Sequence, residues 1–177
     1  MDSEVFRLVV TEIMDDRHHR PQRESIRLVR ERYSDLVGVK GIDRRGIVAI
    51  EFDGVDGSPY RAVWGVDRRR NGSWRVAGGA SSRHRYGKPA DVWVNGGSWA
   101  SGGSGVSTGI WIADPQTQIA RITDPHGRSM EDTVESGVAL FIWKGDFNLR
   151  ASTLELLGSD ANVLWSGPFH RQSWETS

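Results

Sequence analysis

The chain has 177 residues, no cysteine and equal numbers of acidic and basic side chains, so its formal net charge is zero. Without cysteine, disulfides, cysteine-ligated zinc, iron–sulfur clusters and thiol nucleophiles are excluded. A hydrophobic fraction of 37% with 26% charged residues is typical of a globular protein, and the balanced charge gives no whole-chain argument for nucleic acid or membrane binding.

The first ten residues, MDSEVFRLVV, have neither the basic start nor the long apolar stretch of a secretory signal. Elsewhere no segment approaches the roughly 20 apolar residues that a membrane span needs. We therefore expect a soluble, cytoplasmic protein.

Two helices are expected at the N-terminus. In residues 3–16, apolar side chains recur at helical spacing after Ser3, a good N-cap residue. In residues 21–36, Pro21 suits a first helical turn, and Ile26, Val29 and Tyr33 follow at intervals of three and four. The alternation of Ile26 with Leu28 leaves a strand as the competing interpretation of the second segment.

Strand patterns follow at residues 47–52, 60–66 and 74–76, separated by turn-rich sequence. A glycine- and serine-rich run at 78–82, then Gly87-Lys88-Pro89, ends this first unit. We expect residues 1–86 to form an α+β unit in which two helices pack on a small antiparallel sheet.

The second half has almost no helical periodicity and contains seven short strand patterns. They lie at residues 92–94, 108–113, 118–123, 130–135, 138–144, 151–157 and 163–166. The pattern predicts a mainly antiparallel, β-sandwich-like unit over residues 87–167 and a tail over 168–177. Within it, the stretch from Ile119 to Trp143 is typical of a three-stranded β-meander.

Several of these strands are apolar on both faces, because successive apolar side chains point in opposite directions. A solvated antiparallel sheet shows polar residues on one face. One face would therefore form the sandwich core, and the other would be covered by the helical half, another subunit or a ligand. The expected anchors of this interaction face are Trp93, Trp111, Phe141 and Trp143.

Charge is concentrated in one segment although it sums to zero. From Arg61 to Lys88 there are eight basic residues and one acid, Asp67, whereas residues 89–177 have ten acidic and five basic groups. Interleaved aromatic residues suit stacking on bases with phosphate contacts. The alternative is a basic hairpin turn that faces the acidic second half. The expected basic patch is Arg68, Arg69, Arg70, Arg83, Arg85 and Lys88.

Motifs for catalysis, metals and cofactors are weak. The glycine-rich stretch 95–109 lacks the Lys-Ser or Lys-Thr of a phosphate loop and favours a flexible loop or a hairpin. Serines and His126 occur without a nucleophile elbow. Glu12, Asp16 and His19 could approach one another as zinc ligands, but a solvated, hydrogen-bonded helix end is the favoured explanation. No cofactor, metal or catalytic residue is therefore predicted.

The leading hypothesis is a non-enzymatic protein-interaction or self-assembly module, with a protein partner or a homo-oligomer. The second is a nucleic-acid or anionic-ligand binder that uses the basic patch. Carbohydrate binding through exposed tryptophan, or a small hydrolase activity, comes third.

Overall fold

The computed structural model of the chain describes residues 4–15, 20–35, 41–83, 93–99 and 105–169. Within them lie one α-helix, α1 (Glu4–Met14), and two single-turn 3-10 helices, η1 (Arg23–Ser25) and η2 (Leu149–Ala151). The strands are β1 (Arg27–Asp35), β2 (Ile42–Asp53), β3 (Pro59–Arg69), β4 (Trp74–Arg83), β5 (Trp93–Trp99), β6 (Gly105–Trp111), β7 (Ile119–Thr123), β8 (Ser129–Thr133), β9 (Val138–Lys144), β10 (Thr153–Leu157) and β11 (Val163–Pro168). The described part is therefore mostly antiparallel β-structure with one α-helix.

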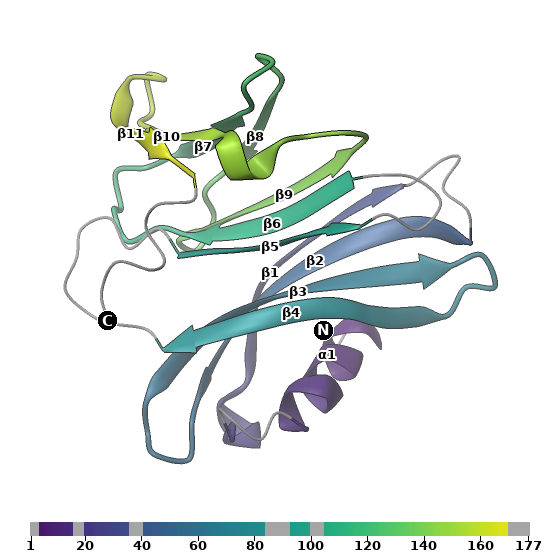
Figure 1. The fold of residues 1–177 in the computed structure, drawn as a ribbon. Helices are drawn as coiled ribbons and strands as arrows, with labels where there is room; N and C mark the ends of the chain where they lie inside the picture. Colours follow the sequence, from purple (N-terminus) through teal and green to yellow (C-terminus); the bar gives the residue numbers. More distant parts are fainter. Residues whose placement is uncertain (1–3, 16–19, 36–40, 84–92, 100–104, 170–177) are drawn as a thin grey trace.

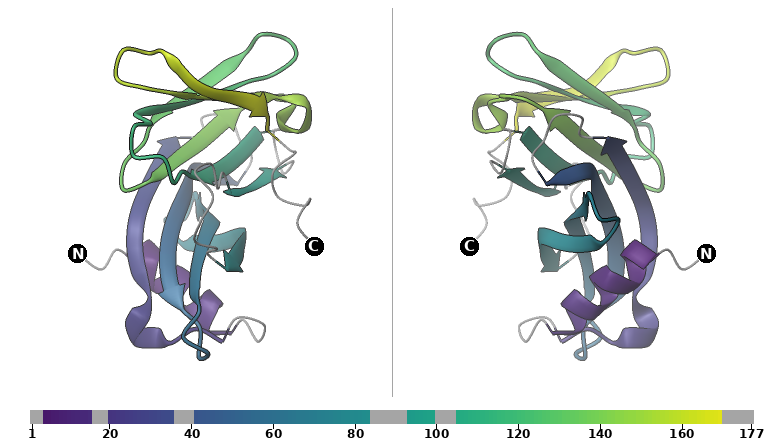
Figure 2. Two further views of the ribbon diagram at one scale, coloured as in Figure 1. Left: turned by 90° about the vertical axis from the view of Figure 1, so that its left-hand side faces the viewer. Right: turned by 90° about the vertical axis from the view of Figure 1, so that its right-hand side faces the viewer.

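Three sheets are stacked in layers (Figure 1). The N-terminal sheet has the order β1-β2-β3-β4, the middle sheet β5-β6-β9, and the C-terminal sheet β11-β10-β7-β8. Figure 1 shows α1 below β4, and the side views in Figure 2 show it against the lower half of the N-terminal sheet, with the C-terminal sheet at the top. The helix packs on the face of the N-terminal sheet that is opposite to the middle sheet. All strand pairs within the three sheets are antiparallel.

Helix α1 was correctly predicted, and its buried side chains explain its position. Val5, Val9 and Ile13 recur every four residues and therefore lie along one side of the helix. They pack against the outer face of the N-terminal sheet, where Val48 and Ile50 of β2 are fully buried.

The second predicted helix is wrong, because most of the segment is strand β1. Its residues pair in antiparallel register with β2, for example Leu28 with Ile50 and Tyr33 with Gly46. The apolar spacing in this segment fits both periods, and a β-bulge between Leu28 and Arg30 further disturbs the alternation. Pairing with the long strand β2, which the local sequence does not reveal, decides the outcome.

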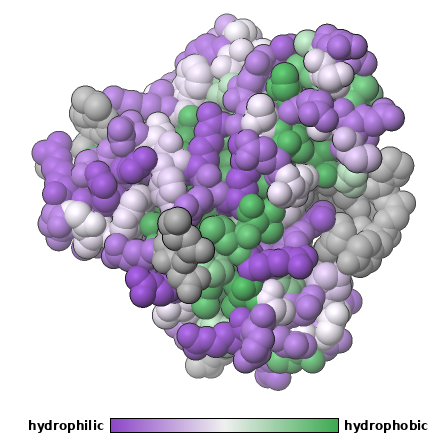
Figure 3. Space-filling view, turned by 180° about the vertical axis from the view of Figure 1, so that it is seen from behind, coloured by the Kyte–Doolittle hydropathy of each residue, from purple (hydrophilic) through white to green (hydrophobic). Residues whose placement is uncertain are grey.

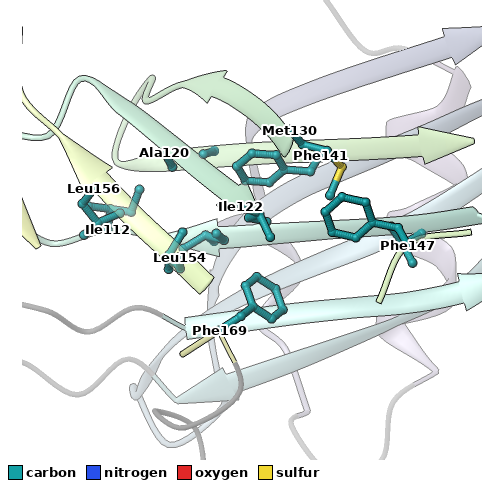
Figure 4. Close-up of a cluster of buried hydrophobic side chains, with 12 residues drawn as sticks. Ile112, Ala120, Ile122, Met130, Phe141, Phe147, Leu154, Leu156 and Phe169 are labelled. Carbon is teal, nitrogen blue, oxygen red and sulfur yellow. The ribbon is translucent and has the colours of Figure 1, made fainter. Parts of the chain in front are cut away.

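In the middle sheet, β6 and the first half of β9 are buried on both faces, as the alternation of apolar residues predicted. All seven residues of β6 are buried. On one face, Trp111 and Leu140 pack against Ile47 and Val63 of the N-terminal sheet. On the other, Phe141 joins the core shared with the C-terminal sheet, and Figure 4 shows its ring beside Met130 and Ile122.

The C-terminal sheet has one apolar and one polar face. The cross-strand partners Ile122 and Leu154 point into the core. The next partners in the register, Arg121 and Glu155, point to the opposite face. On the outer face Arg121 forms ion pairs with Glu131 and Glu155, the latter at 3.3 Å. This alternation is the one expected of a solvated antiparallel sheet.

Two expectations about strand connections need correction. Residues 119–143 do not form a meander, because β7 pairs with β8 whereas β9 leaves for the middle sheet and pairs with β6. The glycine- and serine-rich run at 78–82 does not end the first unit, since it lies inside β4. Glycine at Gly79 is required there because the ring of Trp64 occupies the place of a side chain.

The glycine-rich stretch 95–109 contributes to a hairpin, since β5 and β6 pair from Trp93–Trp111 to Trp99–Gly105. At the other end of the chain, Phe169 is buried in the core between the middle and C-terminal sheets, and its backbone N–H donates to Ser152 at 2.9 Å. The first two residues of the predicted tail therefore belong to the fold, Pro168 as the end of β11 and Phe169 as a buried side chain, and its residues from 170 onward lie outside the described part.

Candidate interaction surface

The four expected aromatic anchors do not share a face. Trp93 pairs with Trp111, which pairs with Val138, whereas Phe141 pairs with Thr108 and points to the opposite side of the sheet. Trp111 is completely buried against the N-terminal sheet and Phe141 is 1% exposed against the C-terminal sheet.

Trp143 is partly buried and contacts Phe147, with ring centroids 5.3 Å apart. Only the backbone of β5, and so of Trp93, is described. The sequence left three alternatives for what covers the second apolar face: the helical half, another subunit or a ligand. In the structure, the N-terminal sheet covers the described part of this face. Trp111 and Phe141 are thus core residues within the chain.

Apolar side chains also reach the surface elsewhere. Seen from behind, apolar areas are interrupted by hydrophilic side chains over the part of this face that is not grey (Figure 3). Among the described large hydrophobic residues, those exposed are Met14 on α1, Val55 in the β2–β3 turn and Val163 on β11, so they form no common patch along one element.

The expected basic patch is divided between two ends of the N-terminal sheet. Arg68 and Arg69 end β3, and Arg70 follows in the turn to β4, whereas Arg83 pairs with Tyr60 at the other end of the same hairpin. At about 3.3 Å per residue, the strand between Tyr60 and Arg68 spans roughly 26 Å. Arg85 and Lys88 lie outside the described residues.

One end of the N-terminal sheet nevertheless gathers arginines from three strands and a turn. We call this the arginine end and define it as residues 33–35, 41–45 and 67–75, which include six arginines and three aspartates. The β3–β4 turn meets the residue just before β2 here, because the backbone N–H of Arg70 donates to the carbonyl of Gly41 at 3.4 Å. Arg69 and Arg70 are exposed at the tip.

Two arginines of this end lie on aromatic rings. Arg44 on β2 lies opposite Arg68 on β3 in the strand register, and Arg68 lies opposite Trp74 on β4, so the three side chains share the outer face of the sheet. The guanidinium carbon of Arg44 lies 5.1 Å from the ring centroid of Tyr33, and that of Arg68 lies 6.0 Å from the ring of Trp74. These are cation–π distances.

The aromatic rings are themselves fixed. Tyr33 and Trp74 contact each other edge to face, with centroids 5.4 Å apart. Tyr33 also lies over Gly46, where an added Cβ would come within 2.5 Å of its ring. The rings therefore form a platform that limits where the arginines can go.

Exposed carboxylates balance part of this charge. Asp43 accepts two hydrogen bonds from Arg68, at 2.9 Å from Nε and 3.3 Å from Nη2. These bonds lower the pKa of Asp43 and raise that of Arg68 from their ordinary values. Asp35 approaches Nε of Arg44 to 3.4 Å, but that nitrogen makes no hydrogen bond.

A buried ion pair anchors the arginine end to the middle sheet. Arg45 donates to Asp67 at 2.8 Å and to Ser107 of β6 at 3.2 Å. The other carboxylate oxygen of Asp67 accepts from Arg75 at 3.1 Å. Desolvation lowers the pKa of Arg45, and the charge of Asp67 opposes this change.

The other candidate residues do not assemble into a reactive group. His126 is exposed in the β7–β8 turn, where its backbone N–H and that of Arg128 donate to Asp124. Side-chain hydrogen bonds from Arg128 are the main cause that lowers the pKa of Asp124 to about 2. Asp16 and His19 lie outside the described residues, within which no three His, Asp or Glu side chains are grouped to hold a metal.

Tyr33, Asp43 and Arg44 were missed as site residues in the sequence. Tyr33 was assigned to a helix, and Asp43 and Arg44 precede the segment recognised as a strand. The signal available was weak, because only Val29 and Tyr33 alternate with Arg30, Arg32 and Ser34, and the charged Glu31 interrupts the pattern.

Comparison of the chain with protein-family models, with curated proteins and with solved structures finds no match. Within the described residues, no helix is long and apolar enough to cross a membrane.

Proposed function

We propose that this chain is a non-enzymatic protein-interaction module that binds an acidic protein segment through the arginine end. The observation that carries the proposal is the position of Arg69 and Arg70. They are exposed at a hairpin tip, next to Arg44 and Arg68 on their aromatic platform. Arginine, tryptophan and tyrosine are the residues that contribute most often to binding energy at protein interfaces.

The mixed charge of this end favours a protein over a nucleic acid. Asp35 and Asp43 pair with Arg44 and Arg68, so this end lacks the continuous row of unpaired cations that follows a phosphate backbone. The chain as a whole also has no excess of positive charge. A protein surface can match both signs, which sets specificity and the rate of association.

A second copy of the chain is one source of such an acidic segment. Residues 89–177 have ten acidic and five basic groups, so the arginine end of one copy is complementary in charge to this half of another. Sedimentation of the pure protein at micromolar concentration separates the two sources. A concentration-dependent, salt-sensitive dimer or larger species would indicate that a second copy supplies the acidic segment. A monomer would indicate that a different protein supplies it.

The proposal is tested with a fluorescein-labelled peptide of ten glutamates, titrated with the full chain at low salt and followed by anisotropy. The double variant Arg69→Ser/Arg70→Ser is expected to bind about tenfold more weakly, because it removes exposed cations at the tip. The control Arg23→Ser/Arg150→Ser removes the same charge from exposed arginines elsewhere and should bind like the wild type.

The second candidate, nucleic-acid binding, is tested in parallel with a labelled single-stranded oligonucleotide of mixed sequence. If it binds more tightly than the peptide, and more weakly as salt rises, that function replaces the one proposed. Equal loss of binding in the control variant would show that the peptide binds by overall charge and not at the arginine end. No binding of either probe would show that the arginines have a structural role.

A further inference from the structure

The ion pair between Asp43 and Arg68 has the same chemistry as the proposed contact between this arginine and an acidic side chain of a partner. Asp43 presents both carboxylate oxygens to Nε and Nη2 of Arg68. This is the side-on, bidentate geometry in which arginine takes a carboxylate from another protein. Both side chains are exposed, by 38% and 36%, so a competing carboxylate can reach the same edge of the guanidinium.

We propose that Asp43 is an internal competitor, which occupies Arg68 in the free protein and is displaced by a carboxylate of the partner. This inference rests on the proposed function and adds the chemistry of the ligand, an aspartate or glutamate side chain bound in a bidentate manner. It also adds a means of specificity, because only a ligand that replaces Asp43 gains access to Arg68.

Arg68 does not depend on Asp43 for its position. Its guanidinium lies over Trp74, and Trp74 is fixed by edge contact with Tyr33. When Asp43 leaves, the guanidinium therefore remains directed to the same face. A ligand meets a group that is already oriented, which reduces the entropy lost on binding.

The neighbouring Arg44 gives the ligand an advantage over Asp43. Arg44 and Arg68 are register partners on adjacent strands, a position in which like charges repel at a Cβ separation of about 5 Å. The Arg44 side chain is 39% exposed, and its ion pair with Asp35 is long, at 3.4 Å. A segment with two acidic side chains can bind both arginines, whereas Asp43 satisfies one.

The direction in which a substitution of Asp43 changes the affinity for the peptide distinguishes competition by Asp43 from a purely structural role. If Asp43 only held the surface in shape, its removal would weaken binding. If it competes, its removal strengthens binding, because the partner no longer has to displace a charged group. Asp43→Asn keeps the shape and one acceptor oxygen of the side chain but removes its charge.

The experiment uses the same ten-glutamate peptide and the full chain. We expect Asp43→Asn to bind about five- to tenfold more tightly than the wild type, and Asp43→Asn/Arg68→Met to lose this gain. The matched control is Asp56→Asn, which removes the same charge from another exposed pair, Asp56 with Arg83. It corrects for the effect of net charge and should change binding less than twofold.

If a variant does not fold, a nuclear magnetic resonance titration of the wild-type protein with the peptide still tests the inference. The side-chain Nε–H signal of Arg68 should shift on peptide addition, and that of Arg83 should not. The inference is overturned if the wild type binds through Arg69 and Arg70 while Asp43→Asn binds no better than Asp56→Asn, or if the Arg68 signal is unchanged. Absence of peptide binding by all variants would instead reject the proposed function itself.

Discussion

At the scale of single residues, the buried ion pair between Arg45 and Asp67 is informative. Arg45 and Asp67 are 5% and 1% exposed, and they lie between the N-terminal and middle sheets. Burial of an ion pair is costly, and such a pair persists only when its remaining polar atoms are also bonded. Ser107 and Arg75 supply two such bonds here, one to Nη2 of Arg45 and one to the second carboxylate oxygen of Asp67.

We therefore expect Asp67→Asn to destabilise the protein by about 3–5 kcal/mol, since it leaves the charge of Arg45 buried without a counter-ion. Arg75→Gln is the control, because it removes the exposed partner of the same carboxylate and should cost less than about 1 kcal/mol. Urea denaturation gives both values. Similar costs for the two variants would mean that Arg45 is solvated in the native protein.

At the scale of elements, strand β9 shows how a sheet edge can be closed without another strand. Its N–H at Leu140 donates to Asp132 of β8 at 2.7 Å. Its carbonyls at Val138 and Leu140 accept from Arg30 and Arg32 of β1, at 2.9 Å and 2.7 Å. Both arginines also pair with Asp132, so one carboxylate connects elements of all three sheets.

Asp132→Asn should destabilise the protein by about 3 kcal/mol, because Arg30 is only 12% exposed and would lose its main counter-ion. The loosened edge should also increase aggregation, since unpaired strand edges recruit other chains. The neighbouring Glu131→Gln, which affects an exposed pair with Arg121, is the control and should cost less than about 1 kcal/mol. Thermal unfolding followed with light scattering measures both effects, and equal behaviour of the two variants would contradict this role.

At the scale of the whole molecule, the two halves of the chain share a core. The cluster between the N-terminal and middle sheets contains Ile47 and Val63 from the first half, and Trp111 and Leu140 from the second. The boundary expected at residue 86 therefore separates segments whose buried faces are completed by each other. We expect the described layers to unfold together.

Leu140→Ala should lower stability by about 2–5 kcal/mol and should do so equally for both halves. Hydrogen exchange can report the two separately, through amides of β2 in the first half and of β10 in the second. Val163→Ala, at a position 53% exposed, is the control and should change stability by less than about 0.5 kcal/mol. A selective loss of protection in β10, with β2 unchanged, would show that the halves are independent domains.

Much of the local structure could be predicted. Helix α1 follows from apolar residues every three or four positions, and β9 was predicted with its observed bounds, 138–144. The two buried faces of the middle sheet followed from the alternation of Leu140 and Phe141. These properties depend on the period of the side chains along one segment, which the sequence contains.

The tertiary structure decided which segments meet. It assigned Trp111 and Phe141 to two different cores, separated Arg83 from Arg68 and Arg69, and brought Tyr33 and Arg44 to the arginine end. The segment 27–35 became a strand because β2 was available to pair with it. Strand pairing and sheet stacking join residues far apart in the chain, so they depend on register and on competition among all strands, which no local pattern specifies.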